Sequence, residues 1–231
     1  MIAKHIPNSI TCCNLISGCI AISYGFYGQQ DMALLWIVIG AVFDFFDGMT
    51  ARLLHVSSPI GKELDSLADV VTFGVAPSTM LFTYMSQLIY PSFLEDFGQY
   101  IPYIAYLMAA FSALRLAKFN LDNRQTVSFI GLPTPANALF WGALIVGVGE
   151  HADSLTYTFW IILLFIFYSC YILVAEIPLF SLKFKTWGWK ENRVRYLFLL
   201  SCIPMLVFLR VIAIPFIIVW YVSLSRMTAK R

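Results

Sequence analysis

Few residues of this chain carry a charge. Of its 231 residues, 12% are charged and 60% are hydrophobic, whereas a soluble domain carries about 25% charged residues. A soluble core could not bury this much apolar surface, so the composition excludes a water-soluble globular protein. It predicts an all-α polytopic membrane protein, because helices satisfy their own backbone hydrogen bonds in lipid. The net charge of +2 gives no indication of a nucleic-acid partner, and we expect none.

Cysteine motifs and long polar segments are also missing. The cysteines fall within apolar stretches and show neither zinc-ligand spacing nor a disulfide framework; they are Cys12, Cys13, Cys19, Cys170 and Cys202. The N-terminus has no small-residue cleavage site, so we expect no signal peptide. No polar stretch is long enough for a soluble domain. We therefore expect one membrane-embedded catalytic domain over residues 1–231, with core helices at about 1–180 and additional helices at about 194–226.

Hydrophobic runs separated by polar breaks predict about eight transmembrane helices. The runs lie at about 12–28, 32–54, 63–90, 99–119, 134–149, 155–178, 194–208 and 210–225. If the N-terminus is cytoplasmic and the spans alternate, 14 of the 15 Lys and Arg residues fall on the cytoplasmic side, as the positive-inside rule prefers. We therefore expect both termini in the cytoplasm, and we expect the membrane to be the plasma membrane of a prokaryote.

The C-terminal stretch admits two interpretations. Residues 195–226 span 32 positions, enough for one long tilted helix that would place the basic tail outside. A hairpin of two short helices turning near Leu209 and Arg210 keeps both ends inside, and Pro204 and Pro215 are consistent with bent arms. We favour the hairpin, and hence eight helices over seven.

Acidic residues are scarce, yet four of them gather in one apolar region. Asp44 and Asp47 lie near the end of the second predicted span, and Asp65 and Asp69 follow in the third. Charge at membrane depth is costly unless it is paired, solvated or bound to metal. Residues three or four apart share a helix face, so two antiparallel helices would face each other with two carboxylates apiece. Such carboxylates repel unless a cation lies between them, and hard divalent cations bind carboxylate oxygens.

Small residues and an arginine accompany the aspartates. Gly48, Ala51 and Gly61 allow close approach of a helix or of a ligand, and Arg52 could meet a phosphate. The alternative is that the acids pair with Arg52 and Lys62 at the interface while the small residues only pack helices. The fixed spacing of the whole set favours a site instead. Two divalent ions, Mg²⁺ or Mn²⁺, would suit phosphoryl transfer there.

The pattern D-x-x-D-G-x-x-A-R-x8-G-x-x-x-D-x-x-x-D over residues 44–69 resembles, at every position, the signature of the CDP-alcohol phosphotransferases. The resemblance implies that family's helical bundle and a homodimer. It implies that Asp44, Asp47 and Asp65 bind a pair of metal ions. It also implies that Asp69 lies beside the metal ions and is the base that deprotonates the acceptor hydroxyl.

By the same resemblance, the nucleotide end of a CDP-lipid is held around Gly48, Ala51, Arg52 and Gly61. A P-N-x-x-T element at residues 7–11 resembles the family's first helix and would add polar contacts from Asn8 and Thr11. Ordinary helix capping is the alternative role of these two residues.

Three further segments resemble the phosphatidylserine synthase branch of that family. They read DSLADVVTFGVAP at 65–77, SALRLAKFN at 112–120 and FIGLPTPA at 129–136. The resemblance implies CDP-diacylglycerol and L-serine as substrates. It departs at position 118, where Lys118 replaces the usual arginine, so a bidentate contact would become a point-charge contact.

A serine substrate brings a carboxylate, which calls for a cation in the pocket. Arg115 and Lys118 lie three apart near the inner end of the fourth span, with Asn120 just beyond, and are our candidates for serine binding. The alternative is that basic residues at this end only set the topology. Glu176 could hold the serine ammonium group or pair with a lysine such as Lys183.

We therefore expect a metal-dependent membrane enzyme that transfers a phosphatidyl group from CDP-diacylglycerol to serine. The same chemistry with glycerol 3-phosphate or inositol phosphate as acceptor remains an alternative. A more remote one is an ion-coupled transporter, although no pair of broken helices in corresponding halves supports it.

Overall fold

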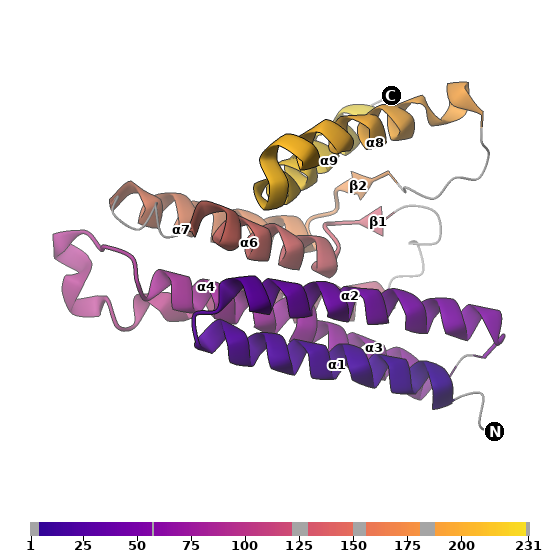
Figure 1. Cartoon of the computed structure of the whole chain (residues 1–231), viewed down its shortest axis with the longest axis horizontal. Helices are drawn as coiled ribbons and strands as arrows, with labels where there is room; N and C mark the ends of the chain where they lie inside the picture. Colours follow the sequence, from indigo (N-terminus) through magenta and orange to yellow (C-terminus); the bar gives the residue numbers. More distant parts are fainter. Residues whose placement is uncertain (1–4, 57, 122–128, 150–155, 181–187, 230–231) are drawn as a thin grey trace.

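Nearly all of the described chain is helical (Figure 1). The computed structural model describes residues 5–56, 58–121, 129–149, 156–180 and 188–229. Its α-helices are α1 (His5–Phe26), α2 (Gln30–Leu53), α3 (Pro59–Asp69), α4 (Ala76–Met85), α5 (Leu107–Leu121), α6 (Thr134–Val148), α7 (Thr156–Val174), α8 (Trp189–Leu209) and α9 (Ala213–Ala229). The all-α prediction is confirmed, with the addition of two short paired strands, β1 (Phe129–Ile130) and β2 (Pro178–Leu179).

Tighter and wider helical turns connect several of these helices. A π-helical turn, η2 (Val70–Val75), joins α3 to α4 without a break in the helical path. The 3₁₀ turns are η3 (Ser92–Phe97), η4 (Ile101–Tyr106) and η6 (Arg210–Ile212). The predicted third span, at about 63–90, is therefore one continuous helix over residues 59–85 that ends five residues earlier than expected. Its hydrogen-bonding pattern changes directly after Asp69.

The helices are long and apolar enough for a multi-pass membrane protein. Six helical stretches of the described residues could cross a bilayer by length and composition: 5–26, 30–53, 59–85, 101–121, 157–174 and 192–228. Helix α6 is apolar but shorter, and the last stretch covers most of α8 and of α9. The number of crossings stays a prediction.

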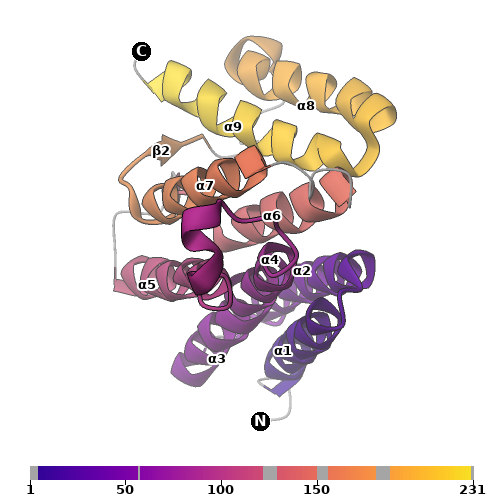
Figure 2. The ribbon, with the colours of Figure 1, turned by 90° about the vertical axis from the view of Figure 1, so that its left-hand side faces the viewer.

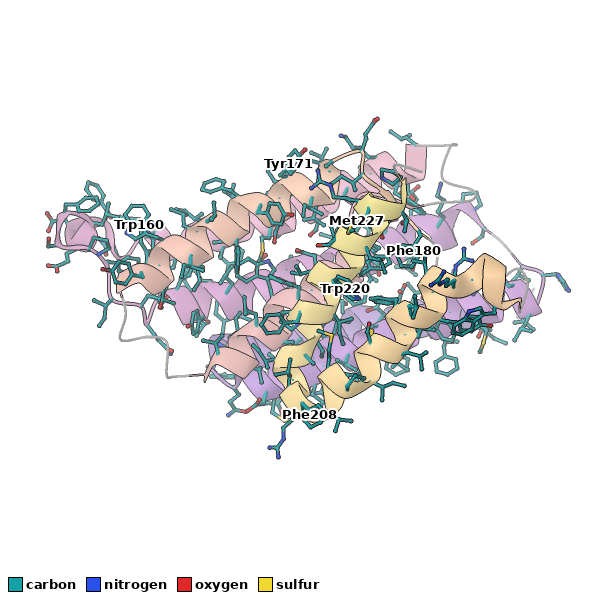
Figure 3. All side chains as sticks on the ribbon, turned by 90° about the horizontal axis from the view of Figure 1, so that it is seen from above. Trp160, Tyr171, Phe180, Phe208, Trp220 and Met227 are labelled. Atoms are coloured by element: carbon teal, nitrogen blue, oxygen red, sulfur yellow. The ribbon has the colours of Figure 1, made fainter. Side chains whose placement is uncertain are left out.

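The C-terminal stretch reverses direction at Arg210. Helix α8 ends at Leu209, Arg210 takes a left-handed backbone conformation with φ 53°, and α9 starts at Ala213. Figure 3 shows Phe208 near the point where the two helices meet, with α9 running back to Met227. The structure thus has the hairpin that we favoured from the sequence in place of a single long helix.

One end of the helical bundle gathers the segments that carry most of the basic residues. Figure 1 places the start of α1, the end of α2, the start of α3 and the start of α8 at the same end. Arg52 lies in the last turn of α2 and Lys118 in the last turn of α5, which end there too. This arrangement agrees with the alternation assumed from the sequence; the side of the membrane that this end faces stays a prediction.

Turn chemistry explains several helix ends. Gly28, after α1, and Gly149, after α6, have φ of 73° and 57°, left-handed values that favour glycine at a helix C-terminus. Ser58 caps α3, because its side chain accepts a hydrogen bond from the Gly61 amide, and Pro59 occupies the first turn. The tight α2–α3 turn therefore presents the N-terminus of α3 beside the end of α2.

Helices α4 and α6 form the centre of the bundle. Figure 2, which looks along the bundle, shows them enclosed by α1, α2, α5 and α7. Met80, Leu81 and Met85 of α4 and Trp141 of α6 have no exposed surface. Trp141 Nε1 also donates a hydrogen bond to Ser169 Oγ of α7, so its one polar group is satisfied in the core.

The α8–α9 pair forms an outer layer on α6, on the side away from α1 (Figure 1). Gly147 of α6 allows the approach, since a Cβ there would lie 2.7 Å from Ile212 Cδ1. Tyr221 of α9 donates a hydrogen bond to the Phe180 carbonyl at 2.7 Å. Many of the outward residues of this pair are apolar and exposed, as expected of helices in contact with lipid.

Candidate metal centre and CDP-lipid pocket

Three of the four predicted aspartates come together. One carboxylate oxygen from each of Asp44, Asp47 and Asp65 lies within 4.8 Å of the others. Asp47 is buried, and Asp44 and Asp65 are half-buried. Asp69 lies outside this set of oxygens but close enough to Asp44 and Asp65 for their charges to interact. The two acidic pairs, from α2 and α3, therefore form one constellation, as the sequence predicted.

Helix α1 supports both acidic helices. Thr11 Oγ1 donates a hydrogen bond to Asp47 Oδ2 at 2.7 Å, and Asn14 Nδ2 donates to Asp69 Oδ1 at 3.3 Å. The prediction that α2 and α3 simply face each other was therefore incomplete, because α1 packs against both. Sequence reasoning missed Asn14. The signal that could have found it is a polar residue every third position along α1, formed by Asn8, Thr11, Asn14 and Ser17.

The basic residues expected as alternative partners of the acids are engaged elsewhere. Arg52 Nε donates to the Gly48 carbonyl at 3.0 Å, and Lys62 Nζ donates to the Asn120 carbonyl at 3.0 Å. Asp65 Oδ1 is buried without a hydrogen-bond partner in the described chain. A buried carboxylate oxygen that lacks a partner is costly, and clustered carboxylates repel. A hard divalent cation held by Asp44, Asp47 and Asp65 would resolve both problems.

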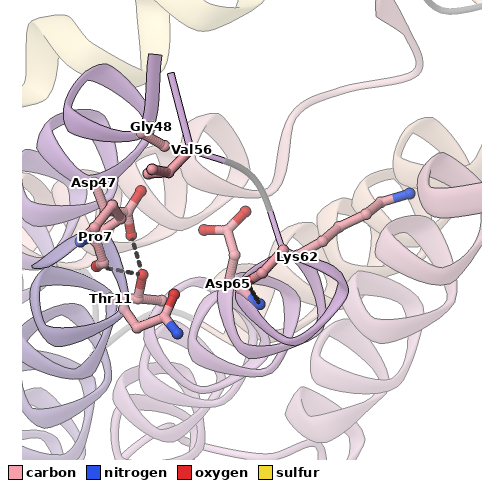
Figure 4. A pocket seen from close by; sticks show the side chains of 11 residues that line it. Pro7, Thr11, Asp47, Gly48, Val56, Lys62 and Asp65 are labelled. Atoms are coloured by element: carbon pink, nitrogen blue, oxygen red, sulfur yellow. Dashed lines mark hydrogen bonds between the residues drawn. The ribbon is translucent and has the colours of Figure 1, made fainter. Parts of the chain in front are cut away.

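A pocket of about 270 Å³ opens directly beside these acids (Figure 4). Five of the predicted lipid-nucleotide residues line it, namely Asn8, Thr11, Gly48, Ala51 and Gly61. Asp47 and Asp65 are in its wall, so the pocket and the acids form one site. Sequence reasoning missed the other lining residues, Pro7, Val56, Ser58 and Lys62. Arg52, also predicted, is exposed and is not among the described residues that line the pocket.

The two predicted glycines have different surroundings. A Cβ added to Gly48 would meet no atom within 4 Å, so this position is open space. A Cβ added to Gly61 would lie 3.0 Å from both Asn8 Oδ1 and Ser58 Oγ. Gly48 thus leaves room for a ligand, whereas Gly61 permits the close approach of α1 to the start of α3.

The N-terminus of α3 contributes to the pocket as well. Ser58, Gly61 and Lys62 are all in its lining. The first turn of a helix presents unpaired backbone N–H groups and the positive end of the helix dipole, which together favour anions. The pocket therefore combines an anion-attracting helix end with a carboxylate set suited to cations, as a metal-bound phosphate requires.

The predicted serine-binding residues separate into different environments. Arg115 is buried, its Nε lacks a hydrogen-bond partner in the described chain, and its charge interacts with that of Asp69. Lys118 is exposed. Asn120 Nδ2 donates to Ser66 Oγ at 2.8 Å, which ties the end of α5 to α3. The structure brings Arg115 close enough to Asp69 for their charges to interact, and neither Arg115 nor Lys118 is among the described residues that line the pocket.

Glu176 is exposed and lies between α7 and β2. Lys183, the lysine considered as one alternative partner of Glu176, lies outside the described residues.

Comparison with known proteins identifies the site's family. A model described as CDP-alcohol phosphatidyltransferase matches residues 4–182. A Bacillus subtilis protein named CDP-diacylglycerol–serine O-phosphatidyltransferase is 41% identical over 136 residues, which are 57% of this chain and 70% of that protein. Proteins with the same name from Helicobacter pylori strain J99 and Methanocaldococcus jannaschii are 38% and 37% identical over 58% and 64% of this chain.

The match spans only 54% of the Helicobacter protein and 62% of the Methanocaldococcus protein. The family model covers the whole acidic constellation, since residues 4–182 include α1 to α3 and their aspartates. The chain therefore belongs to the CDP-alcohol phosphatidyltransferase family.

Proposed function

We propose that this protein transfers the phosphatidyl group of CDP-diacylglycerol to the hydroxyl of L-serine, giving phosphatidylserine and CMP. The observation that carries the proposal is the meeting of Asp44, Asp47 and Asp65, two of which, Asp47 and Asp65, line the pocket that Gly48 leaves open. The names of the three relatives, each a CDP-diacylglycerol–serine O-phosphatidyltransferase, support serine as the acceptor.

The acidic set fits a divalent-metal cofactor. We propose two ions, Mg²⁺ or Mn²⁺, held by Asp44, Asp47 and Asp65, with Asp69 beside them. When bound, such ions neutralise the pyrophosphate charge and stabilise the entering and leaving oxygens of a phosphoryl transfer. The buried, partnerless Oδ1 of Asp65 supports this assignment.

The chain's own residues then bind and orient the two substrates. The pocket lined by Asn8, Thr11, Gly48, Ala51 and Gly61 holds the CMP portion of the lipid, and the acyl chains extend into the bilayer. Asp69 accepts the proton of the serine hydroxyl. The serine oxygen bonds to the phosphorus that carries the diacylglycerol, and the bond from that phosphorus to the CMP oxygen breaks.

Serine suits the cation beside Asp69 better than a phosphate-bearing acceptor does. Arg115 is the one buried Lys or Arg among the described residues, and one guanidinium matches one carboxylate. Glycerol 3-phosphate or inositol phosphate would bring a dianion and call for a second cation. Lys118 is exposed, so its predicted part in serine binding is not supported by its position.

The location of the site suggests its cellular orientation. The acids lie toward the end of the bundle that carries the basic residues, and the positive-inside rule assigns this end to the cytoplasm. We therefore propose a cytoplasm-facing site in a prokaryotic plasma membrane, where serine and CDP-diacylglycerol both have access. We also propose a homodimer, as implied by the family resemblance.

The first experiment measures CMP release from CDP-diacylglycerol by the purified protein. L-serine, glycerol 3-phosphate, inositol phosphate and no acceptor are compared, each with Mg²⁺, Mn²⁺ or a chelator. We expect release that requires both serine and a metal ion. Release with another acceptor alone would overturn the serine assignment and keep the chemistry. Absence of release from folded protein under every condition would overturn the enzyme assignment.

Replacing Asp69 tests its role as the base. We expect Asp69→Asn to abolish phosphatidylserine formation, because the amide cannot accept the hydroxyl proton, while metal-dependent binding of the CDP-lipid survives. Turnover and equilibrium binding are measured on the same preparation. Loss of CDP-lipid binding together with turnover would assign Asp69 to holding the metal ions instead.

A further inference from the structure

Asn14 has no exposed surface and lies at the junction of three helices. Its Nδ2 donates to Asp69 Oδ1 of α3 at 3.3 Å. Its Oδ1 has no hydrogen-bond partner in the described chain. A buried amide with an unsatisfied oxygen costs stability, so this residue is not explained by the packing of the fold alone.

Two glycines and a threonine fix the place of Asn14. A Cβ on Gly40 of α2 would lie 3.0 Å from Asn14 Oδ1 and 2.5 Å from Thr72 Cγ2. A Cβ on Gly18 of α1 would lie 2.8 Å from the Thr72 Cα. Thr72 Oγ1 in turn donates to the Asn14 carbonyl at 3.0 Å. Thr72 is therefore enclosed between α1 and α2, and the Asn14 amide has little freedom to rotate.

The π-helical turn brings Thr72 to this position. It begins at Val70, directly after Asp69, and Thr72 is buried within it. Single π-turns inside helices occur frequently at functional sites. Because the turn is anchored to α1 through Thr72, the backbone that carries Asp69 is fixed relative to the Asn14 side chain.

We infer that Asn14 is a positioning residue for Asp69 in the proposed reaction. Its amide holds one oxygen of the Asp69 carboxylate, which orients the carboxylate toward the acceptor hydroxyl. The inference rests on the proposed function. Thr11, one turn earlier on α1, makes the equivalent contact to Asp47, a proposed metal ligand. The two donors thus support different steps: Thr11 supports metal binding, and Asn14 supports proton transfer.

The test compares Asn14→Ala and Asn14→Asp with Ser17→Ala. Asn14→Asp keeps the side-chain volume but replaces the donor with a second carboxylate. Ser17 is the matched control, because it is buried on the same helix and its Oγ, within the part of the chain that the structure describes, donates to the Cys13 carbonyl of its own helix and not to an aspartate. For each variant, kcat, KM for CDP-diacylglycerol, metal-dependent CDP-lipid binding and the thermal unfolding midpoint are measured.

We expect both Asn14 variants to lower kcat by about 10- to 100-fold with unchanged KM and CDP-lipid binding, and Ser17→Ala to match the wild type. Wild-type kcat in Asn14→Ala would overturn the inference. The inference would also be overturned if CDP-lipid binding and the unfolding midpoint fell in parallel with kcat in both variants, because a parallel fall indicates a structural role. Wild-type protein that forms no phosphatidylserine would instead overturn the proposed function and, with it, this inference.

Replacing Thr11 separates the two donors. We expect Thr11→Val to raise the metal concentration needed for half-maximal CDP-lipid binding, a change that Asn14→Ala does not produce. If Asn14→Ala raises it equally, Asn14 supports metal binding and the assignment to proton transfer is overturned.

Discussion

Within an apolar 18-residue part of residues 59–85, 61% of the residues are buried, whereas in an apolar part of the same length within residues 192–228 only 11% are buried. Both stretches are apolar enough to cross a membrane, yet the first carries Asp65 and Asp69 and contacts α1, α2, α5 and α6. The second is an outer hairpin with Phe208 83% exposed. A polar site at membrane depth requires neighbours that donate hydrogen bonds and exclude lipid, and only the enclosed helices have such neighbours.

The contrast extends to the use of small residues. Gly18 and Gly40 bring α1 and α2 into contact with Thr72, whereas Gly147 brings α6 into contact with Ile212. Gly18 and Gly40 surround polar groups that reach Asp69. The contact between Gly147 and Ile212 is wholly apolar. Close helix packing is therefore common to both regions. The regions differ in the groups that are packed, which are polar around Thr72 and apolar around Ile212.

The largest expected effect comes from an acid in the enclosed region. We expect Asp65→Asn to lower turnover by about 10³-fold or more, because the variant loses a proposed metal-binding charge beside the developing charge of the reaction. CMP release measures the change. Asp31→Asn is the control, since Asp31 is exposed in the first turn of α2 at the other end of that helix. If both variants lost turnover to a similar extent, Asp65 would have no greater part in the reaction than an exposed acid such as Asp31.

A change at the α1–Thr72 contact should affect stability. We expect Gly18→Ala to destabilise the protein by about 1–3 kcal/mol, because the added Cβ overlaps backbone that cannot move aside. Gly48→Ala is the matched control for stability, since a Cβ added at this position meets no atom within 4 Å. The midpoint of unfolding in detergent micelles reports the difference. Equal midpoints would mean that α1 does not pack tightly against the π-turn.

Filling the open position beside the acids should affect binding without affecting the fold. We expect Gly48→Leu to raise KM for CDP-diacylglycerol about tenfold, which corresponds to about 1.4 kcal/mol of binding energy, because the side chain enters the proposed ligand space. Steady-state kinetics with the lipid in mixed micelles tests this. An unchanged KM would place the nucleotide elsewhere.

The smallest effect is expected on the outer hairpin. We expect Phe208→Ala to change stability by less than about 0.5 kcal/mol and to leave turnover unchanged, because this ring is exposed and is not among the described residues that line the pocket. Unfolding midpoint and CMP release are measured together. A loss of turnover would show that the outer hairpin, like the enclosed helices, contributes to function.

Much of this protein could be predicted from its sequence. Composition and hydrophobic runs determined the helical membrane architecture, because a chain with 12% charged residues cannot hide its apolar surface in water. The helical period placed Asp44 with Asp47 and Asp65 with Asp69. The reversal at Arg210 followed from the length of the last apolar stretch and from the charge at its two ends.

Only the tertiary structure decided which groups support the aspartates. The contacts Thr11–Asp47 and Asn14–Asp69 join residues 36 and 55 positions apart, and helical periodicity shows which face is polar but not which helix it meets. For the same reason the sequence could not predict that Arg115 is buried and Lys118 exposed, since the two residues are only three apart. The π-turn after Asp69 is likewise decided by packing, because it is where Thr72 meets Gly18 and Gly40.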